Sequence, residues 1–267
     1  MLWDTHLHTK FSGDSTSNPR DMIENSIKKG LSGICFTDHQ DLEYSATPGL
    51  FDLDFPNYQK EILLLKEEYK NKFPICWGVE LGVQPDTVKG NKKIASTYPF
   101  DFIIASSHEI NHKDLYYSDF YVGREELDCY REYFEAILEN LHTDIDFDVY
   151  GHLDYVVRYG PNKNKYYSYE KFSDIIDAIL LRIVEKGKGI ELNTAGFKYG
   201  LGHPNPTEAI IKRYRELGGE IITIGSDGHT PEQIAWDFQK IPDILKNAGF
   251  EYFTVFKERK PNFIKIE

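Results

Sequence analysis

Six of the nine histidines stand at or just after the ends of short apolar runs that are typical of buried strands. One carboxylate ends another such run, and a second lies between the seventh run and the histidine that follows it. Neutral imidazole and carboxylate are the ligands that first-row divalent metal ions take in proteins. One such residue could be structural, but eight at successive strand ends predict a metal site. The residues are His6, His8, His39, Glu80, His108, His152, Asp227 and His229.

The spacing inside these motifs predicts how the ligands share ions. Residues i and i+2 of a strand face the same side, so His6 and His8 can bind one metal. Glu80 has two carboxylate oxygens and can bridge two metals. Asp227 and His229 repeat the spacing around a flexible glycine, so they can serve neighbouring ions.

Other polar residues near these motifs have different expected roles. Asp14 lies in the loop after the first strand and can reach the same site. Asp38 could bind metal, but its neighbour His39 is preferred, and Asp38 is expected to orient it. His112 and His203 fall in loops and are expected to be exposed or to face a substrate rather than to bind metal.

The elements that must position these side chains alternate along the chain. Apolar runs rich in Ile, Val, Phe and Tyr alternate with amphipathic helical patterns. Pro19, Pro206 and Pro231 are expected in first helical turns, and Pro242 is expected to kink or split the last helix. Strands are expected at residues 2–7, 33–37, 75–80, 102–107, 147–151, 189–193, 220–225 and 252–256. Helices are expected at residues 19–29, 57–70, 124–141, 169–186, 206–217 and 231–247.

About seven strand–helix units predict a parallel sheet that closes into a barrel. In such a barrel the carboxyl ends of the strands converge on one rim, where active sites lie. No linker, repeat or low-complexity tract interrupts the pattern, so residues 1–267 are expected to form a single α/β domain.

Composition excludes several classes of partner. The chain has 31 Lys and Arg against 43 Asp and Glu, a net charge of −12, so it repels nucleic acid and anionic membranes. No apolar run approaches the roughly 18 residues of a membrane span. The N-terminus does not resemble a secretion signal, and three cysteines form no disulfide framework. We therefore expect a cytoplasmic protein with no nucleic-acid or membrane partner.

These motifs resemble those of the polymerase and histidinol phosphatase (PHP) superfamily, in the family's order along nearly the whole chain. Within it, the chain is similar to bacterial histidinol-phosphate phosphatases in its length and in residues 151–160 and 191–196. The resemblance implies a distorted, TIM-like (β/α)7 barrel with a trinuclear metal centre. The matching motifs are Asp4-Thr5-His6-Leu7-His8-Thr9, Phe36-Thr37-Asp38-His39, Gly78-Val79-Glu80, Ser107-His108, Gly151-His152-Leu153-Asp154 and Gly225-Ser226-Asp227-Gly228-His229.

The resemblance also implies how the ligands divide among three divalent ions, for which zinc, iron and manganese remain open. Many members have histidine at the position of Asp14, so the centre here carries one more negative charge. Three divalent ions and three carboxylates leave about +3, which would attract a phosphomonoester dianion. The implied sites are His6, His8, Glu80 and Asp227; Glu80, His108 and His152, with Glu80 bridging; and Asp14, His39 and His229.

We therefore expect a metal-dependent phosphomonoesterase that hydrolyses L-histidinol phosphate to L-histidinol and inorganic phosphate in histidine biosynthesis. A hydroxide bridging the first two metals is expected to attack phosphorus. Arg158 offers phosphate a planar cation, and Asp154 or Asp227 could relay a proton to the leaving oxygen. The residues expected to contact the amino-imidazole end are Glu109, Tyr117 and Asn193.

Two alternatives stay open, and the oligomeric state is not indicated. A PHP-type nucleotide phosphoesterase or nuclease would share the metal site, but the net charge and the lack of a basic stripe disfavour a polymeric substrate. A non-catalytic metal-binding domain would be expected to have lost some of the nine candidate ligands, and all nine are present.

Overall fold

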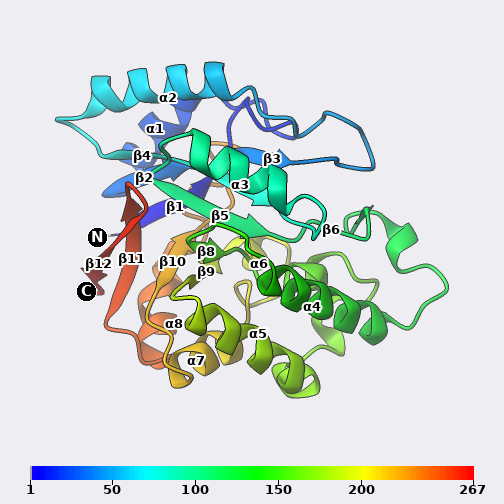
Figure 1. The fold of residues 1–267 in the computed structure, drawn as a ribbon. Coiled ribbons are helices and arrows are strands. Elements are labelled where there is room, and N and C mark those ends of the chain that lie inside the picture. The colour runs from blue at the N-terminus through cyan, green and yellow to red at the C-terminus, as the bar shows by residue number, and fades with distance from the viewer. Residues whose placement is uncertain (1) are drawn as a thin grey trace.

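A parallel sheet runs through most of the computed structural model, which describes residues 2–267 (Figure 1). Its strands are hydrogen-bonded in the order β1-β2-β4-β5-β8-β9-β10, and the short β3 pairs with the end of β4. The strands are β1 (Trp3–Leu7), β2 (Gly33–Phe36), β3 (His39–Asp41), β4 (Ile75–Gly82), β5 (Phe102–Ser106), β8 (Val149–Tyr150), β9 (Gly189–Asn193) and β10 (Ile222–Gly225).

The two ends of this sheet meet and nearly close it into a barrel. Thr5 Oγ1 on β1 donates to the carbonyl of Ile224 on β10 at 2.9 Å. Just beyond them, His8 N donates to the carbonyl of Gly228 at 2.9 Å. The predicted (β/α)7 barrel is therefore confirmed, with seven strands in the closing path over residues 2–267.

Helices cover the outside of the barrel (Figure 1). The first begins where Asn18 accepts a hydrogen bond from Arg20 N at 2.9 Å, with Pro19 in its first turn, as expected of a capped helix start. Gly187, with φ of 66°, ends the helix at residues 173–185, because glycine adopts this left-handed conformation without steric cost. The helices are α1 (Pro19–Lys28), α2 (Phe55–Tyr69), α3 (Val88–Thr97), α4 (Glu126–His142), α5 (Ser173–Glu185), α6 (Ala195–Lys198), α7 (Glu208–Glu216) and α8 (Ile241–Asn247).

Apolar side chains fill the layer between the helices and the sheet. Tyr58 and Ile62 of α2 are fully buried and face β4, where Trp77 is also buried. Burying one large apolar side chain contributes roughly 1.5–3 kcal/mol, so this layer holds each helix against its strand. The strand ends that carry polar side chains are thereby fixed relative to one another.

The last predicted strand forms, but it lies outside the barrel. It is β11 (Tyr252–Lys257), which pairs antiparallel with β12 (Lys260–Lys265). The turn between them brings Arg259 within 2.5 Å of Asp148, at the end of the barrel opposite the strand carboxyl ends. The hairpin β11–β12 therefore anchors the amino-terminal end of the barrel.

Two helix predictions were too long. In place of residues 231–247, the helix α8 begins at Ile241, because Pro242 occupies its first turn, where proline is favoured. Pro231 precedes it in a series of turns. Helix α7 begins after Thr207 rather than at Pro206.

Several short elements were not predicted. They are β3, α3, α6, β12 and the hairpin of β6 (Glu109–Ile110) and β7 (Lys113–Asp114). Three short 3₁₀ turns of residues 2–267 were also missed: Ser118–Phe120, Tyr155–Arg158 and Lys163–Lys165. Tyr169–Phe172 and Phe238–Lys240 are 3₁₀ turns within ranges that were predicted as helix. No helix in the described part of the chain combines the length and apolar character needed to cross a bilayer.

Candidate metal centre and the adjoining cavity

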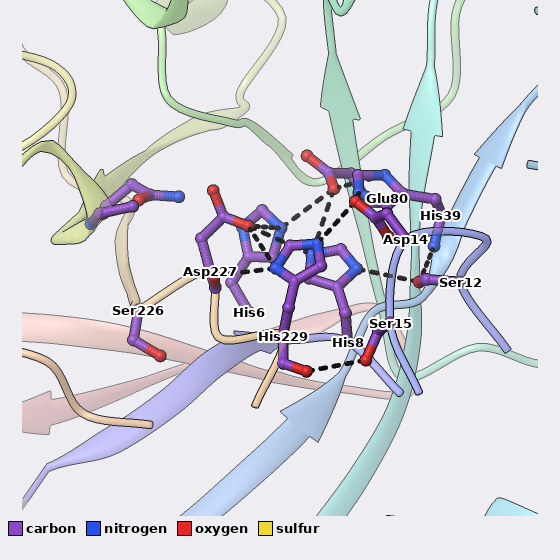
Figure 2. A network of polar contacts seen from close by, with 12 residues as sticks. His6, His8, Ser12, Asp14, Ser15, His39, Glu80, Ser226, Asp227 and His229 are labelled. Atoms are coloured by element: carbon purple, nitrogen blue, oxygen red, sulfur yellow. Dashed lines mark hydrogen bonds and ion pairs between the residues drawn. The ribbon is translucent and has the colours of Figure 1, made fainter. Parts of the chain in front are cut away.

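The fully buried carboxylate of Glu80 lies at the centre of the strand carboxyl ends. Figure 2 shows the imidazoles of His6, His8 and His39 pointing toward it. Five imidazole nitrogens lie within 3.6 Å of its two oxygens. The distances are 3.1 Å for His6, 3.6 Å for His8, 3.0 Å for His39, 3.3 Å for His108 and 2.9 Å for His152.

Strand geometry accounts for this convergence. Glu80 lies near the end of β4, and β3 pairs with it in a register that sets His39 opposite Glu80. His6 lies on β1 and His8 directly follows it, two residues on and toward the same side, as the alternation of a strand requires. The barrel therefore brings together residues far apart in the sequence.

Donor atoms in this cluster fall into groups that match the predicted metal sites. The donors of the first group lie within 4.8 Å of one another, as do those of the second. The first group comprises His6, His8 and Glu80, and the second comprises Glu80, His108 and His152. A third group joins His39 and His229 to His8, and a fourth joins His39, Asp41 and His108.

The two remaining predicted ligands face these groups. Asp227 Oδ1 lies 3.4 Å from His8 Nε2, beside the first group. Asp14 Oδ2 lies 3.0 Å from His229 Nε2 and 3.7 Å from His39 Nε2, beside the third. All nine predicted ligands therefore stand in one cluster, although the sequence did not suggest that His8 would also face the third group.

The cluster contains buried polar atoms with no hydrogen-bond partner among residues 2–267. An unpaired buried donor or acceptor costs about 1–3 kcal/mol, so a folded protein rarely keeps several together. Lone pairs of imidazole and carboxylate that converge in this way fit divalent metal ions. The atoms are His6 Nε2, His8 Nε2, His39 Nδ1, Glu80 Oε2 and His229 Nε2.

Charge interactions keep the two central carboxyl groups ionised. Burial alone would raise the pKa of Glu80, but the surrounding imidazoles of His6 and His39 hold it well below its usual range. Burial likewise opposes ionisation of Asp227, and the Arg158 guanidinium outweighs it and holds the pKa of Asp227 well below its usual range. Ionised carboxylates are the form that binds metal.

Acidic residues behind the cluster orient two of the imidazoles. His6 Nδ1 lies 2.6 Å from Glu191 Oε1, and His108 Nδ1 lies 2.9 Å from Asp41 Oδ2. Such a contact fixes the ring so that the other nitrogen, Nε2, faces the centre. The sequence pointed to neither acid as a partner, although a Glu at an inward-facing position of an apolar strand was a usable signal for Glu191.

Asp38 organises the loop after β1 rather than joining the cluster. Its Oδ1 accepts hydrogen bonds from Thr9 N at 2.6 Å and from Ser12 N at 3.1 Å. Ser12 Oγ also donates to Asp38 and lies 3.1 Å from His8 Nδ1. Asp38 thus holds the loop that carries Asp14 and orients His8, where its expected partner was His39.

The turn that carries Asp227 and His229 is held from two sides. Asp227 has φ of 53°, a left-handed conformation that costs a non-glycine residue about 1–2 kcal/mol. Asp4 accepts a hydrogen bond from Ser226 N at 2.9 Å, and Lys198 donates to the Asp227 carbonyl at 3.1 Å. These contacts offset the strain and aim the Asp227 carboxylate at the cluster.

Arg158 is buried against Asp227 and makes no surface ion pair. It donates to Asp227 Oδ2 at 2.8 Å, to Asn193 Oδ1 at 3.0 Å and to Asn205 Oδ1 at 2.8 Å. Asn193, which was predicted to contact the substrate, therefore faces the guanidinium. Asp154 lies one step further back, where its carboxylate accepts from Asn205 Nδ2 at 2.5 Å.

A cavity of about 310 Å³ opens beside the third donor group. The predicted substrate residue Tyr117 lines it, whereas Glu109 does not and instead accepts a hydrogen bond from Ser45 N at 2.9 Å. The lining residues in the described chain include no Lys or Arg. They are Asp14, His39, Asp41, Tyr44, Leu50, Phe51, His108, Asp114, Tyr116, Tyr117, Tyr155, Tyr159 and Tyr199.

Comparison with known proteins identifies the family. Residues 4–195, well over half of the chain, match the PHP domain family. The chain belongs to this family. The resemblance seen in the sequence motifs is therefore confirmed.

Its relatives match over nearly their full length. A histidinol-phosphatase of Lactococcus lactis is 34% identical over 96% of this chain and 95% of its own. A probable histidinol-phosphatase of Clostridium acetobutylicum is 35% identical over 97% and 98%. The solved structure of a Lactococcus lactis histidinol phosphate phosphatase with zinc, L-histidinol and phosphate superimposes with a TM-score of 0.91, at 32% identity over 98% of both chains.

Replacing Glu191 tests whether the acids behind the cluster maintain its geometry. Glu191→Gln keeps the size of the side chain but removes the charge that orients His6, so metal affinity should fall about 10- to 100-fold. Competition with a chromogenic chelator measures this affinity. Glu185→Gln, a matched change on the exposed face of α5, should leave it unaltered. Equal affinity in the two variants would contradict the orienting role.

Proposed function

We propose that this protein is a metal-dependent phosphomonoesterase that hydrolyses L-histidinol phosphate to L-histidinol and inorganic phosphate in histidine biosynthesis. The observation that carries the proposal is an acidic, tyrosine-lined cavity directly beside a cluster of nine candidate metal ligands. The Lactococcus lactis relative, whose solved structure contains zinc, L-histidinol and phosphate, supports the same substrate.

The donor groups support a centre of three divalent ions, zinc among the candidates. His6, His8, Glu80 and Asp227 would hold the first, and Glu80 would share the second with His108 and His152. Asp14, His39 and His229 would hold the third, with His8 close by. Bound there, the ions would neutralise charge on the phosphoryl oxygens and bring the pKa of water toward neutrality.

Arg158 is suited to position the phosphoryl group. One terminal nitrogen donates an N–H to Asp227, and the other donates an N–H to Asn193. Each has a second N–H for which no partner is recorded among the described residues. The rings of Tyr155 and Tyr199 lie 5.1 Å from its guanidinium carbon, so the group is held in place. A fixed planar cation with two free donors matches two phosphate oxygens.

Asp227 is better placed than Asp154 to move a proton. Its Oδ1 faces the first donor group, and the Arg158 guanidinium holds its pKa low, so the carboxylate is ionised and can accept a proton from the attacking water. The same oxygen can return that proton to the leaving alkoxide. Asp154 is fully buried behind Asn205, so it acts by supporting Arg158 rather than by touching the reacting atoms.

The cavity favours a leaving group that carries positive charge. L-histidinol has an ammonium and an imidazole, and the cavity offers Asp14, Asp41 and Asp114 together with six tyrosine rings. Cations bind over aromatic faces with about 0.5–2 kcal/mol each, and carboxylates add to this. The same lining repels nucleotides and other substrates with additional negative charge.

The cysteines and the net charge bear on where the protein acts and on which partners it binds. Cys35, Cys76 and Cys129 are buried and unpaired, which supports a reducing cytoplasm. The net charge of −12 and the acidic cavity argue against nucleic acid as partner or substrate. We infer that residues 1–267 act as one phosphoesterase domain.

A substrate panel tests the leaving-group preference. Efficiency, kcat/KM, is measured by phosphate release for L-histidinol phosphate, O-phosphoserine, a nucleoside monophosphate and a short single-stranded oligonucleotide. L-histidinol phosphate should lead by about 10²-fold or more, because the acidic lining attracts its positively charged leaving group and repels substrates with additional negative charge. Equal turnover of a nucleotide would contradict the assignment and favour a nucleotide phosphoesterase.

Arg158→Lys tests the phosphate-binding role. Lysine keeps a positive charge near Asp227 but cannot bind phosphate while contacting both asparagines, so kcat/KM should fall about 10-fold or more, or about 1.4 kcal/mol. Metal content should stay the same. Arg124→Lys makes the same change at an exposed pair with Glu132 and should have no effect. Unchanged efficiency in Arg158→Lys would leave Arg158 only as a partner of Asp227.

A further inference from the structure

The loop of residues 42–53, between β3 and α2, forms one wall of the cavity beside the metal cluster. Tyr44, Leu50 and Phe51 from this loop line the cavity. The ring of Phe51 packs edge-on against that of His39, with centroids 5.1 Å apart. The position of this loop therefore sets both the shape of the cavity and its distance from the candidate ligands.

The 42–53 loop is secured at its base but has few contacts farther out. At the base, Asp41 N donates to the Phe51 carbonyl at 3.2 Å and Leu53 N donates to Gln40 Oε1 at 3.0 Å. Residues 45–50 are exposed to solvent. Farther out, Leu50 packs closely against Gly13 of the loop after β1, and contacts with the β6–β7 hairpin hold the part around Tyr44 and Ser45.

Two carboxylates on that hairpin make these contacts. Ser45 donates both its backbone N–H, at 2.9 Å, and its hydroxyl to Glu109 Oε1. The neighbouring Tyr44 hydroxyl donates to Asp114 Oδ2. Asp114 itself lines the cavity, whereas Glu109 does not, so Glu109 can be changed without removing a cavity wall.

Glu109 is itself held firmly. It is only 5% exposed, and its second oxygen accepts a hydrogen bond from Gln84 Nε2 at 3.3 Å. Gln84 in turn accepts a hydrogen bond from His112 N at 2.9 Å, on the turn of the same hairpin. The carboxylate thus links the strand end of β4, the hairpin and the 42–53 loop, and a charged acceptor binds Ser45 more strongly than a neutral one.

We propose that Glu109 is a positioning residue for leaving-group selection. It acts through Ser45 on Tyr44 and Phe51, and it touches neither the substrate nor the metal cluster. This inference rests on the proposed function, which supplies the identity of the leaving group, L-histidinol. Loss of the Glu109 charge should loosen the cavity wall while leaving the phosphate end of the site unchanged.

The test compares Glu109→Gln and Ser45→Ala, singly and together, with Glu139→Gln as the matched control. Glu139 is an exposed glutamate on α4 near Glu109 and makes no contact with the 42–53 loop that the described residues record. Steady-state kinetics are measured with L-histidinol phosphate and with p-nitrophenyl phosphate, which lacks the ammonium and the imidazole. Hydrogen–deuterium exchange of residues 42–53 is followed without substrate.

For L-histidinol phosphate, Glu109→Gln should raise KM about 5-fold or more and change kcat less than about 2-fold. Constants for p-nitrophenyl phosphate and the metal content should stay near those of the unaltered protein. Exchange in residues 42–53 should accelerate. Ser45→Ala should raise KM and accelerate exchange as well. In the double variant, the change in log KM should be smaller than the sum of the two single changes, because both substitutions remove the same interaction.

Unchanged KM and exchange in Glu109→Gln would overturn the proposal. Equal losses of kcat for both substrates, or loss of metal, would also overturn it, because they would indicate a general structural role. Ser45 is exposed, so Ser45→Ala tests the same contact if Glu109→Gln fails to fold. If the unaltered protein does not prefer L-histidinol phosphate, the proposed function fails, and the exchange measurement still decides whether Glu109 holds the loop.

Discussion

A fully buried carboxylate, Glu80, encircled by five imidazoles is the constraint on which the rest of the structure depends. Burying such a charge in a protein interior is costly unless opposite charge compensates it. The surrounding imidazoles supply that charge when they are protonated. Divalent cations would supply it while leaving the imidazoles neutral, with their converging lone pairs free to bind the ions. The barrel supplies what this requires, because its parallel strands deliver side chains from distant segments to one rim.

Behind the imidazoles, a continuous set of buried hydrogen bonds holds the side chains of the site in position. Glu191 contacts His6, the His152 backbone at 3.1 Å and Asn193 at 3.0 Å. Asn193 then contacts Arg158, and Arg158 contacts Asp227. The two ends of the site are thus linked through Glu191 and Asn193, which lie behind the candidate ligands, and through Arg158. Hydrogen bonds in a buried network stabilise one another, so removing one member should weaken the contacts of the others.

The candidate ligands could be proposed from the sequence because they follow local patterns: histidines at strand ends, and pairs separated by one residue on a strand. The structure brings all nine into one cluster. The barrel followed from the number of strand–helix units. Local patterns could not reveal that residues 252–256 pair in a hairpin outside the barrel, since strand periodicity is the same in both settings. Local patterns also could not give the direction of the Glu109 side chain. Glu109 was expected to contact the substrate, but its carboxylate accepts a hydrogen bond from Ser45 N. Glu191 and Asp41 were missed because their partners are distant in sequence.

Elemental analysis of protein purified without chelators tests the central claim most directly. The account predicts about three transition-metal ions per chain, because the nine candidate ligands divide into three sets and several of their donor atoms have no hydrogen-bond partner within residues 2–267. Asp14→Ala should remove about one of them, since Asp14 faces only the third group. A fully active protein with one ion or none would contradict the account, as would a full metal complement in Asp14→Ala.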